Sequence, residues 1–440
     1  MIGAYDHDFR VDATPLTEQA AVAHIHGICF KTGPPERVGV ELEWLVRDAR
    51  DPALPVEPDR VESALADLGS PGALPARGCL TTEPGGQLEL SSLPAASIGD
   101  CIADAARDMA AVTEAMHEAG LCLSGHGLDP FRPPLRVLDS PRYAAMEEFF
   151  DRSGRAGRIM MCSTASVQVC LDAGEEGPGQ QGYCRRWHLL HKIGPVLVAA
   201  FANSPLVQGR PTGWRSTRQA VWAQLDPGRT RPPQENGRPG MSSDLRSRWA
   251  HYALDSELMC VRRPDNESWV APPGLTFRDW LRGADAAGFR GSHGIASARV
   301  DGERRPTVDD LEYHLSTLFP PVRPRGHIEL RMIDAQSGDG WVVPTAVAWA
   351  LVSDAQAADV AFAAVEPLWN APGDPWLRAA RHGPADGAVA RAVRECFEAA
   401  DAALRRSAAP ATLLRSVTNF TERYVERDRC PADDLLKELP

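Results

Sequence analysis

Four segments of the sequence alternate polar and apolar residues with a period of two, and this alternation constrains the fold more than any other feature. In residues 37–46, Glu41 and Glu43 fall on one face, opposite apolar side chains. Successive side chains of a β-strand point to opposite faces. This segment therefore predicts a strand with one polar and one apolar face. Three further segments follow the same plan: residues 81–92, 163–172 and 326–334.

The polar faces of the other three segments collect carboxylates, amides, hydroxyls and an arginine. In chain order these side chains are Gln87, Glu89, Ser91, Thr164, Ser166, Gln168, Cys170, Asp172, His327, Glu329 and Arg331. Strict alternation also places Ile333 on the face of Glu329 and Arg331. We expect the apolar faces to pack on helices, and the polar faces to lie together.

A sheet with one solvated face would show the same alternation, and for a single strand that is the simpler interpretation. A solvated face usually mixes in lysine, however, and none of the four segments contains one. Carboxylates that are brought together repel one another unless cations join them. Magnesium prefers carboxylate oxygens and is usually bound together with substrate phosphates. We therefore favour a concave polar face that binds metal and an anionic ligand.

The rest of the chain predicts helices without a regular βαβ alternation. Helices are expected at residues 17–30, 61–68, 97–120, 185–202 and 309–318, and from residue 344 onward; further strands are expected at 121–128 and 159–172. Residues 229–240 and 263–274 have the composition of loops, and residues 284–306 give no clear prediction. This irregular mixture predicts an α+β fold, with a mostly antiparallel sheet and helices packed outside. We expect one domain over residues 1–440, with residues 341–440 as its mainly helical C-terminal part.

Charge and cysteine content limit the class of protein. The net charge of −12 argues against a nucleic-acid partner. The 10 cysteines form no C-x-x-C pair, which predicts reduced thiols and a cytoplasmic protein. No run of residues is long and apolar enough to predict a membrane span, and the N-terminus has no apolar signal core. The phosphate-loop, H-E-x-x-H and G-x-S-x-G motifs are missing from the sequence.

Five blocks, spread over residues 38–334, resemble the plant-type glutamate–cysteine ligase family and occur in the family's order. They are GVELEWLV, TTEPGGQLELSS, MMCSTASVQVCLD, FANSPLVQGRPTGWRSTRQAVW and HLSTLFPPVRPRGHIELRMID. The chain is most similar to the actinobacterial branch, which makes γ-glutamylcysteine for ergothioneine. The resemblance implies a curved, mostly antiparallel sheet that forms a half-barrel active site, as in the glutamine synthetase-like ligases.

The resemblance also implies a reaction. ATP phosphorylates the γ-carboxylate of glutamate, and the amine of cysteine then attacks, which gives γ-glutamylcysteine, ADP and phosphate. Two or more Mg²⁺ ions are implied, with Glu41, Glu43, Glu89 and Glu329 as their ligands or the immediate supports of those ligands. Glu43 and Arg331 are the implied catalytic residues. Substrate and nucleotide binding is implied for Gln87, Arg142, Tyr143, Met146, Thr164, Gln168, Arg218 and Arg331, although Tyr143 and Met146 fit an ordinary structural role as well.

Two alternatives stay open. The first is a ligase of the same fold with another amine acceptor, since a few pocket residues decide which acceptor is used. Cys170 and His327, which depart from the plant pattern, are compatible with such a shift. The second is a non-catalytic nucleotide- or anion-binding protein. Retention of every candidate carboxylate argues against it, because unneeded buried carboxylates are costly. Control by a disulfide is not expected, and the sequence leaves the oligomeric state open.

Overall fold

A computed structural model describes residues 14–233, 244–264, 266–283 and 304–438 of the chain. At its centre is an open seven-stranded sheet with the order β2-β3-β1-β5-β9-β8, and β4 pairs with the far end of β1. Each of these pairings is antiparallel. The strands are β1 (Val38–Asp48), β2 (Cys79–Thr82), β3 (Leu88–Ser91), β4 (Leu121–Ser124), β5 (Ser166–Leu171), β8 (Val322–Pro324) and β9 (Ile328–Asp334). A separate short hairpin joins β6 (Leu206–Val207) and β7 (Arg210–Pro211).

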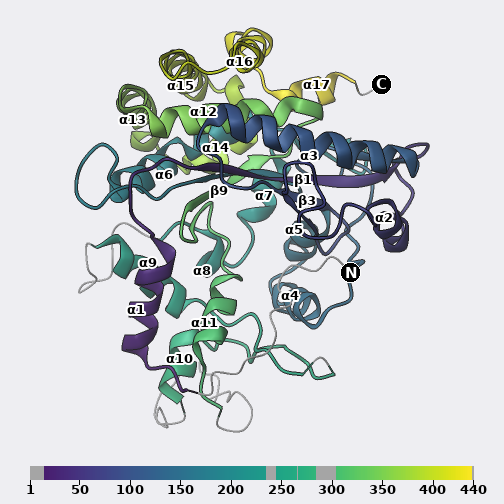
Figure 1. Cartoon of the computed structure of the whole chain (residues 1–440), viewed down its shortest axis with the longest axis vertical. Coiled ribbons are helices and arrows are strands. Elements are labelled where there is room, and N and C mark those ends of the chain that lie inside the picture. The colour runs from purple at the N-terminus through teal and green to yellow at the C-terminus, as the bar shows by residue number, and fades with distance from the viewer. Residues whose placement is uncertain (1–13, 234–243, 265, 284–303, 439–440) are drawn as a thin grey trace.

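One face of the sheet is covered by several layers of helices, drawn above the sheet in Figure 1. These helices are α3 (Ile98–Glu118), α6 (Tyr183–Ala200), α12 (Val342–Ser353), α13 (Ala355–Asn370), α14 (Pro375–His382), α15 (Gly387–Arg406) and α16 (Ala411–Arg423). Helix α12 is apolar on all sides because it lies between β5 and the outer helices α13, α15 and α16. The main hydrophobic core includes this side and continues into helices beyond the sheet, and the apolar face of β1 joins it through Val40, Leu42 and Trp44.

Shorter helices and loops lie on the other side of the sheet (Figure 1). They are α1 (Glu18–Cys29), α4 (Pro141–Asp151), α5 (Ala156–Ser163), α7 (Thr217–Trp222), α8 (Pro227–Thr230), α9 (Leu245–Asp255), α10 (Phe277–Arg282) and α11 (Val308–Leu315). A second hydrophobic cluster, rich in methionine and aromatic residues, joins α4, α5 and α7 to Phe319. The remaining helices are α2 (Pro58–Ala64) and α17 (Pro431–Lys437), with the single turns η3 (Gly338–Trp341), η4 (Gly383–Ala385) and η5 (Val425–Arg427).

This architecture confirms the predicted α+β fold with an antiparallel sheet and helices around it. The hydroxyls of Thr17 and Ser97 cap two of the expected helices, where they accept hydrogen bonds from the first turns of α1 and α3. From Gly338 to Lys437 the chain runs through helices and their connections. All 10 cysteines are free thiols. In the part of the chain that the structure describes, each helix is too short or too polar to cross a membrane.

Three local predictions are wrong. Residues 159–172 do not form one strand, because α5 continues to Ser163 before β5 begins; a short apolar run does not distinguish a buried helix from a strand. The strand expected at 121–128 ends at Ser124. Beyond it, Gly125 packs so closely on Gln336 that a Cβ atom would lie 2.0 Å from the carbonyl oxygen of Gln336. Residues 227–230 form α8 where a loop was expected from 229. Residues 234–243 and 284–303 lie outside the described residues.

Candidate active site on the polar face of the sheet

The strand register brings the predicted polar side chains onto one face of the sheet. Across β1 and β3, Glu43 lies opposite Glu89. Across β1 and β5, Glu41 lies opposite Gln168. Directly opposed residues of antiparallel strands share a face, so these four side chains stand together. On the next strand, Glu329 lies opposite Cys170 and extends the same face.

A continuous chain of hydrogen bonds crosses this face from β1 to β9. The amide nitrogen of Gln168 donates to Oε1 of Glu43 at 2.6 Å, and its Oε1 accepts from Nη1 of Arg331 at 2.5 Å. The same Arg331 nitrogen also donates to Glu329. Gln168 is only 1% exposed, so the bridge lies in the interior of the site. Gln168 therefore links Glu43 to Arg331 through hydrogen bonds and holds the two side chains in place relative to each other.

A register shift between β5 and β9 changes which residues of β9 face the site. Val167 pairs with Ile333, but Val169 pairs with Leu330, so β9 contains one extra residue between these pairs. Such bulges re-aim side chains and are common beside active sites. As a consequence, Ile333 lies in the apolar core, which corrects its predicted place on the polar face. Asp334 moves to the polar side instead, opposite Ser166.

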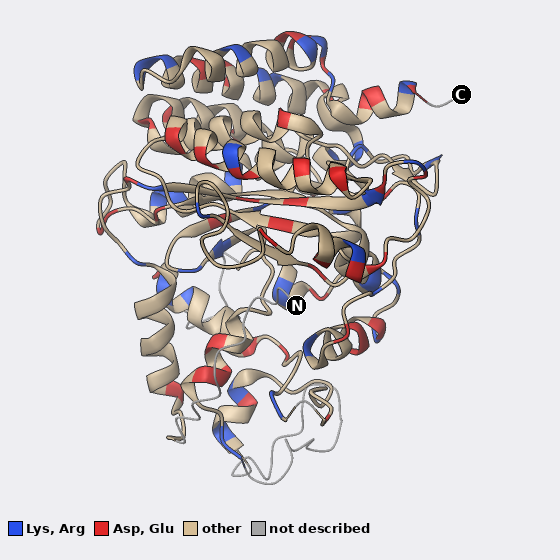
Figure 2. Ribbon diagram, turned by 45° about the vertical axis from the view of Figure 1, so that its right-hand side comes forward, with Lys and Arg blue, Asp and Glu red and all other residues tan. Residues whose placement is uncertain are grey.

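Four carboxylates crowd the part of the site formed by β1, β2 and β3, and Figure 2 shows acidic positions on strands of the sheet layer. Burial raises the pKa of Glu41 to about 7, and the negative charge of Glu329 adds to this shift. Burial also raises the pKa of Glu83 to about 7, with Glu43 adding to it. The pKa of Glu89 is raised well above its ordinary value by burial and then by Glu41 and Glu83. Full ionisation of this group therefore requires added positive charge.

Glu83 was not among the predicted site residues. It follows β2, where Thr81 lies opposite Glu89 and donates a hydrogen bond to it at 3.0 Å. Counting two residues from Thr81 along the strand reaches Glu83, so period-two alternation could have identified it. The Pro-Gly-Gly sequence that directly follows is typical of a turn, and it hides the continuation of the alternation to Glu83.

The carboxylate group is not a preformed metal cage. Among the described residues, no three His, Cys, Asp or Glu side chains are arranged so that they hold a metal ion. Mg²⁺ is usually bound by one or two carboxylates together with waters and substrate phosphates, so a closed protein cage is not required. Hard oxygen donors with raised pKa values on one face fit that mode of binding.

Glu329 differs from the other glutamates because two arginines neutralise it. Arg323 on β8 donates to both carboxylate oxygens, with distances of 2.9 to 3.1 Å. Arg331 contacts Oε1 from the other side. Although burial alone would raise it, the pKa of Glu329 is held below its ordinary value by Arg323 and Arg331. Glu329 is fully buried and both of its oxygens accept hydrogen bonds from the two arginines, and its expected role at the metal ions stays a prediction.

Arg218 lies beside the hydrogen-bonded chain and carries unused donors. Its Nη2 donates to the carbonyl oxygen of Arg331 at 2.8 Å, and its Nη1 lies 3.9 Å from Oδ1 of Asp334. In the described part of the chain, Nε and Nη1 of Arg218 and Nε of Arg331 are buried without a hydrogen-bond partner. Buried donors are nearly always satisfied in proteins. Unused guanidinium donors on two neighbouring arginines are therefore suited to an anionic ligand.

Asp334 forms an ion pair with Arg218, and both of its carboxylate oxygens accept hydrogen bonds from other residues. Its carboxylate accepts three hydrogen bonds of 2.7 to 2.9 Å, from the backbone of Asn203 and the hydroxyls of Ser204 and Ser216. Sequence reasoning missed Asp334 because the bulge in β9, which puts it on this side of the sheet, depends on pairing with β5 and has no local signal.

Two predicted binding residues are used by the protein itself. The amide of Gln87 donates to the carbonyl oxygens of Met161 and Thr164 at 3.2 and 2.9 Å and accepts from the backbone of Gly85. The hydroxyl of Thr164 donates to the carbonyl oxygen of Met160 at 2.7 Å. Gln87 therefore ties the turn to the end of α5 and does not face a ligand as expected.

The same packing explains the glycines of this turn. A Cβ atom on Gly85 would lie 2.2 Å from the carbonyl oxygen of Cys162. The turn therefore approaches the backbone at the end of α5 closely. Gly86 has a φ of +83°, a conformation that favours glycine.

Of the predicted residues of α4, Met146 lies in the second hydrophobic cluster, Tyr143 packs against it, and Arg142 and Tyr143 interact electrostatically with Glu83. Arg142 donates to the hydroxyl and the carbonyl oxygen of Ser316 at 3.1 and 3.3 Å, and its guanidinium lies 5.0 Å from the ring centre of Tyr313. Burial, and then the charge of Glu83, raises the pKa of Tyr143. Met146 is buried in the cluster itself, so in this structure it packs. Arg142 and Tyr143 border the site, and Met146 supports them.

Comparison with known proteins gives a consistent assignment. Residues 37–438 match the glutamate–cysteine ligase family 2 (GCS2). The glutamate–cysteine ligase EgtA of Mycobacterium tuberculosis (strain ATCC 25618 / H37Rv) is 38% identical, and the match covers 96% of this chain and 91% of that protein. The EgtA of Mycolicibacterium smegmatis is 39% identical over 95% of this chain and 90% of its own length. Glutamate–cysteine ligase A, chloroplastic, of Oryza sativa subsp. indica is 29% identical over 73% of this chain and 63% of its length.

A glutamate–cysteine ligase structure from Francisella tularensis, in complex with AMP, aligns with 93% of this chain and 85% of its own. The TM-score is 0.48 and the sequence identity 13%. At this level of similarity nothing is carried over from that structure.

Proposed function

Because the chain belongs to glutamate–cysteine ligase family 2, we propose that it joins the γ-carboxylate of L-glutamate to the amine of L-cysteine at the expense of ATP. The products are γ-glutamylcysteine, ADP and phosphate, and γ-glutamyl phosphate is the intermediate. The proposal assigns the product to ergothioneine biosynthesis, on the resemblance to the actinobacterial branch, and the reaction to the cytoplasm. The family match spans most of the chain, which supports one catalytic domain.

The observation that carries the proposal is the crowding of carboxylates next to two arginines with unused donors. An ATP-dependent ligase must gather two anionic substrates and metal ions in one place. Glu41, Glu43 and Glu89, joined by Glu83, are proposed to hold Mg²⁺, because they lie together on one face and the raised pKa values of Glu41, Glu83 and Glu89 mark a site in need of positive charge. When bound, Mg²⁺ neutralises phosphate charge and orients the transferred group.

The arginines are proposed to bind the anionic groups of the substrates. Arg218 and Arg331 carry buried N–H donors without a hydrogen-bond partner, interact electrostatically with Glu43 and are paired with Asp334 and Glu329. Donors that are positioned before the reaction stabilise developing charge most effectively. Arg331 and Glu43, coupled through Gln168, are the proposed catalytic pair. The border residues Arg142 and Tyr143 are proposed to contact the amino-acid substrates.

The test is ADP release by purified protein with ATP, Mg²⁺ and glutamate, in the presence and absence of cysteine and with other amino acids as competing acceptors. We expect release to require both glutamate and cysteine, with γ-glutamylcysteine identified by mass. Release that follows another amine would move the acceptor and keep the site. Tight nucleotide binding without release under any condition would contradict the proposed activity. Glu43→Gln should abolish release, whereas Glu398→Gln on the exposed surface of α15 should not change it.

A further inference from the structure

Arg323, which was not among the predicted site residues, donates hydrogen bonds to both carboxylate oxygens of Glu329. Arg323 lies on the edge strand β8, directly opposite Glu329 on β9. Its Nε donates to Oε2 of Glu329 at 3.1 Å, and its Nη2 lies 2.9 Å from each carboxylate oxygen. Nη1 donates to the carbonyl oxygen of Leu318 at 3.3 Å, so the guanidinium is fixed at both ends. Arg323 is buried, with only 7% of its surface exposed.

We propose that Arg323 is a positioning residue for the ligase reaction: it orients and neutralises Glu329, so that Arg331 keeps its alignment and its positive charge is not balanced by Glu329. The inference rests on the proposed function, because it assigns Arg323 a role in binding that function's anionic substrates. Arg323 does not touch the region of unused donors and acts through Glu329 and Arg331.

Charge counting explains why two arginines are needed. Glu329 is fully buried and carries one negative charge between the two guanidinium groups. Without Arg323, the pair of Arg331 and Glu329 would be neutral, because the positive charge of Arg331 would be balanced by Glu329. With Arg323 added, the group of three carries a net charge of about +1 next to Glu43 and Gln168. Glu43 and Glu41 also act on Arg331, so this positive charge faces the carboxylates of the site, and an anionic ligand that enters together with metal ions meets Arg331 and its unused Nε donor.

Geometry gives the second reason. A forked pair between an arginine and a carboxylate fixes the plane of the carboxylate, which a lysine does not. The fixed Oε1 of Glu329 then receives Nη1 of Arg331, and the same nitrogen reaches Gln168 at 2.5 Å. The orientation of Arg323 therefore affects the position of Arg331 through Glu329. Arg331 in turn contacts Gln168, which bridges to Glu43. A purely structural role, holding the edge strand to the sheet, would need neither the charge nor this alignment.

The test is a double-mutant cycle on the full chain, with kcat and KM measured for glutamate and for ATP. The proteins are wild type, Arg323→Met, Arg331→Lys and the double variant. We expect Arg323→Met to lower kcat/KM at least 100-fold in the wild-type background but less than 10-fold in the Arg331→Lys background, since Arg323 acts through Arg331. Equal losses in both backgrounds, or a loss within twofold for Arg323→Met alone, would overturn the inference.

Two further proteins keep the result interpretable. Arg323→Lys preserves the charge and removes the forked geometry, so it carries the test if Arg323→Met does not fold. We expect its kcat/KM to fall at least tenfold with an unchanged thermal midpoint, and a value within twofold of wild type would overturn the proposal. Arg405→Met, in an exposed ion pair with Asp401 on α15, is the control and should match wild type. If the wild-type protein does not ligate, the proposed function fails. Binding of inorganic phosphate to the same variants then tests Arg323 separately. A Kd for phosphate that rises at least tenfold in Arg323→Met supports its role, and an unchanged Kd overturns it.

Discussion

Glu43 on β1 and Glu89 on β3 lie directly opposite each other in the sheet, as an acidic pair on the same face. Like charges in directly opposed positions destabilise an antiparallel pair. Burial adds to the cost of ionising Glu89, as its raised pKa indicates. A sheet chosen only for stability would not place these residues together, so their pairing indicates a functional site that the rest of the fold stabilises.

Replacement of Glu89 should therefore separate stability from activity. In Glu89→Gln the opposed charge is removed, and we expect the free energy of unfolding of the Mg²⁺-free protein to rise by up to about 1 kcal/mol. Turnover should fall at least 100-fold, because a proposed metal ligand is lost. Chemical denaturation and the ADP-release assay measure the two effects. A variant that is less stable and fully active would show that Glu89 has a structural role instead.

The raised pKa values of Glu41 and Glu83 predict a pH-dependent stability that Mg²⁺ reduces. Both have a pKa of about 7 in the folded protein, against about 4.3 for glutamate in an unfolded chain. Between these values the folded state binds more protons, so its stability decreases as the pH rises toward 7. Denaturation curves at pH 5, 6 and 7 should show this decrease in EDTA, and saturating Mg²⁺ should diminish it. The same decrease in Glu41→Gln/Glu83→Gln would rule out these groups as its source.

His314 should produce the opposite pH dependence. It is buried on α11, where its Nε2 lies 2.8 Å from the carbonyl oxygen of Ala253. Burial, and then the charge of Arg229, lowers its pKa to about 3. As the pH falls, His314 is protonated in the unfolded chain before it is protonated in the folded protein. The folded protein therefore loses stability as the pH falls below about 6.5. From the shift we expect a loss of about 2 kcal/mol at pH 5. The difference between wild type and His314→Gln across pH 5 to 7 isolates this contribution, and parallel curves for the two proteins would refute it.

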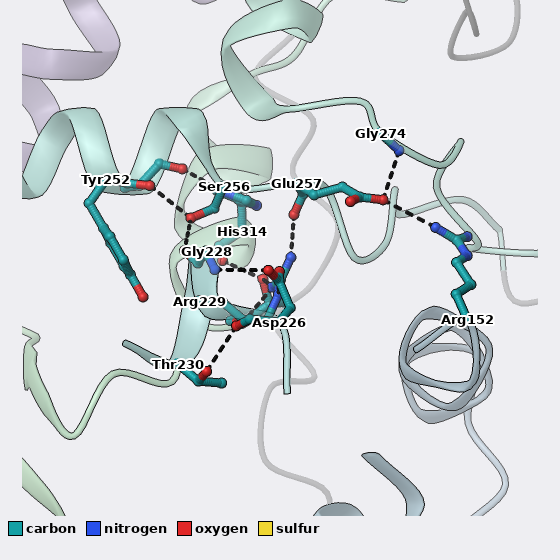
Figure 3. Close-up of polar contacts among 12 residues, drawn as sticks. Arg152, Asp226, Gly228, Arg229, Thr230, Tyr252, Ser256, Glu257, Gly274 and His314 are labelled. Carbon is teal, nitrogen blue, oxygen red and sulfur yellow. Dashed lines mark hydrogen bonds and ion pairs between the residues drawn. The ribbon is translucent and has the colours of Figure 1, made fainter. Parts of the chain in front are cut away.

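Arg229 should matter for stability and not for substrate binding. Figure 3 shows it with Asp226 and the Ser256–Glu257 segment around it. Its guanidinium bonds Asp226 at 3.1 Å, the carbonyl oxygen of Thr317 at 2.8 Å and the carbonyl oxygen of Glu257. Loss of a fully buried charge with these partners should cost about 3 kcal/mol.

The matched control for Arg229→Met is Arg152→Met. Arg152 contacts the Glu257 side chain at 3.3 Å in the same region but is partly exposed (Figure 3). A partly exposed ion pair contributes up to about 1 kcal/mol. We expect KM values close to wild type in both variants and a much lower thermal midpoint only in Arg229→Met. Equal midpoints would mean that the buried network around Arg229 does not anchor α8.

The sequence by itself determined which face of the sheet five of its polar side chains take. Glu41, Glu43, Glu89, Gln168 and Glu329 could be placed on one face because side-chain direction in a strand depends only on the count of residues. The caps of α1 and α3 were equally local, since a hydroxyl and the next turn of backbone suffice. The family resemblance rested on the same short blocks.

Tertiary structure decided what these side chains do. The bulge in β9 exchanged Ile333 for Asp334, and the approach of α5 turned Gln87 inward to the backbone. The pairing of β8 with β9 gave Glu329 a second arginine partner. Each of these outcomes depends on contacts between segments far apart in the chain, whose geometry and desolvation carry no local signal. A sequence period can show which face a side chain takes, but only packing settles which partner it meets there.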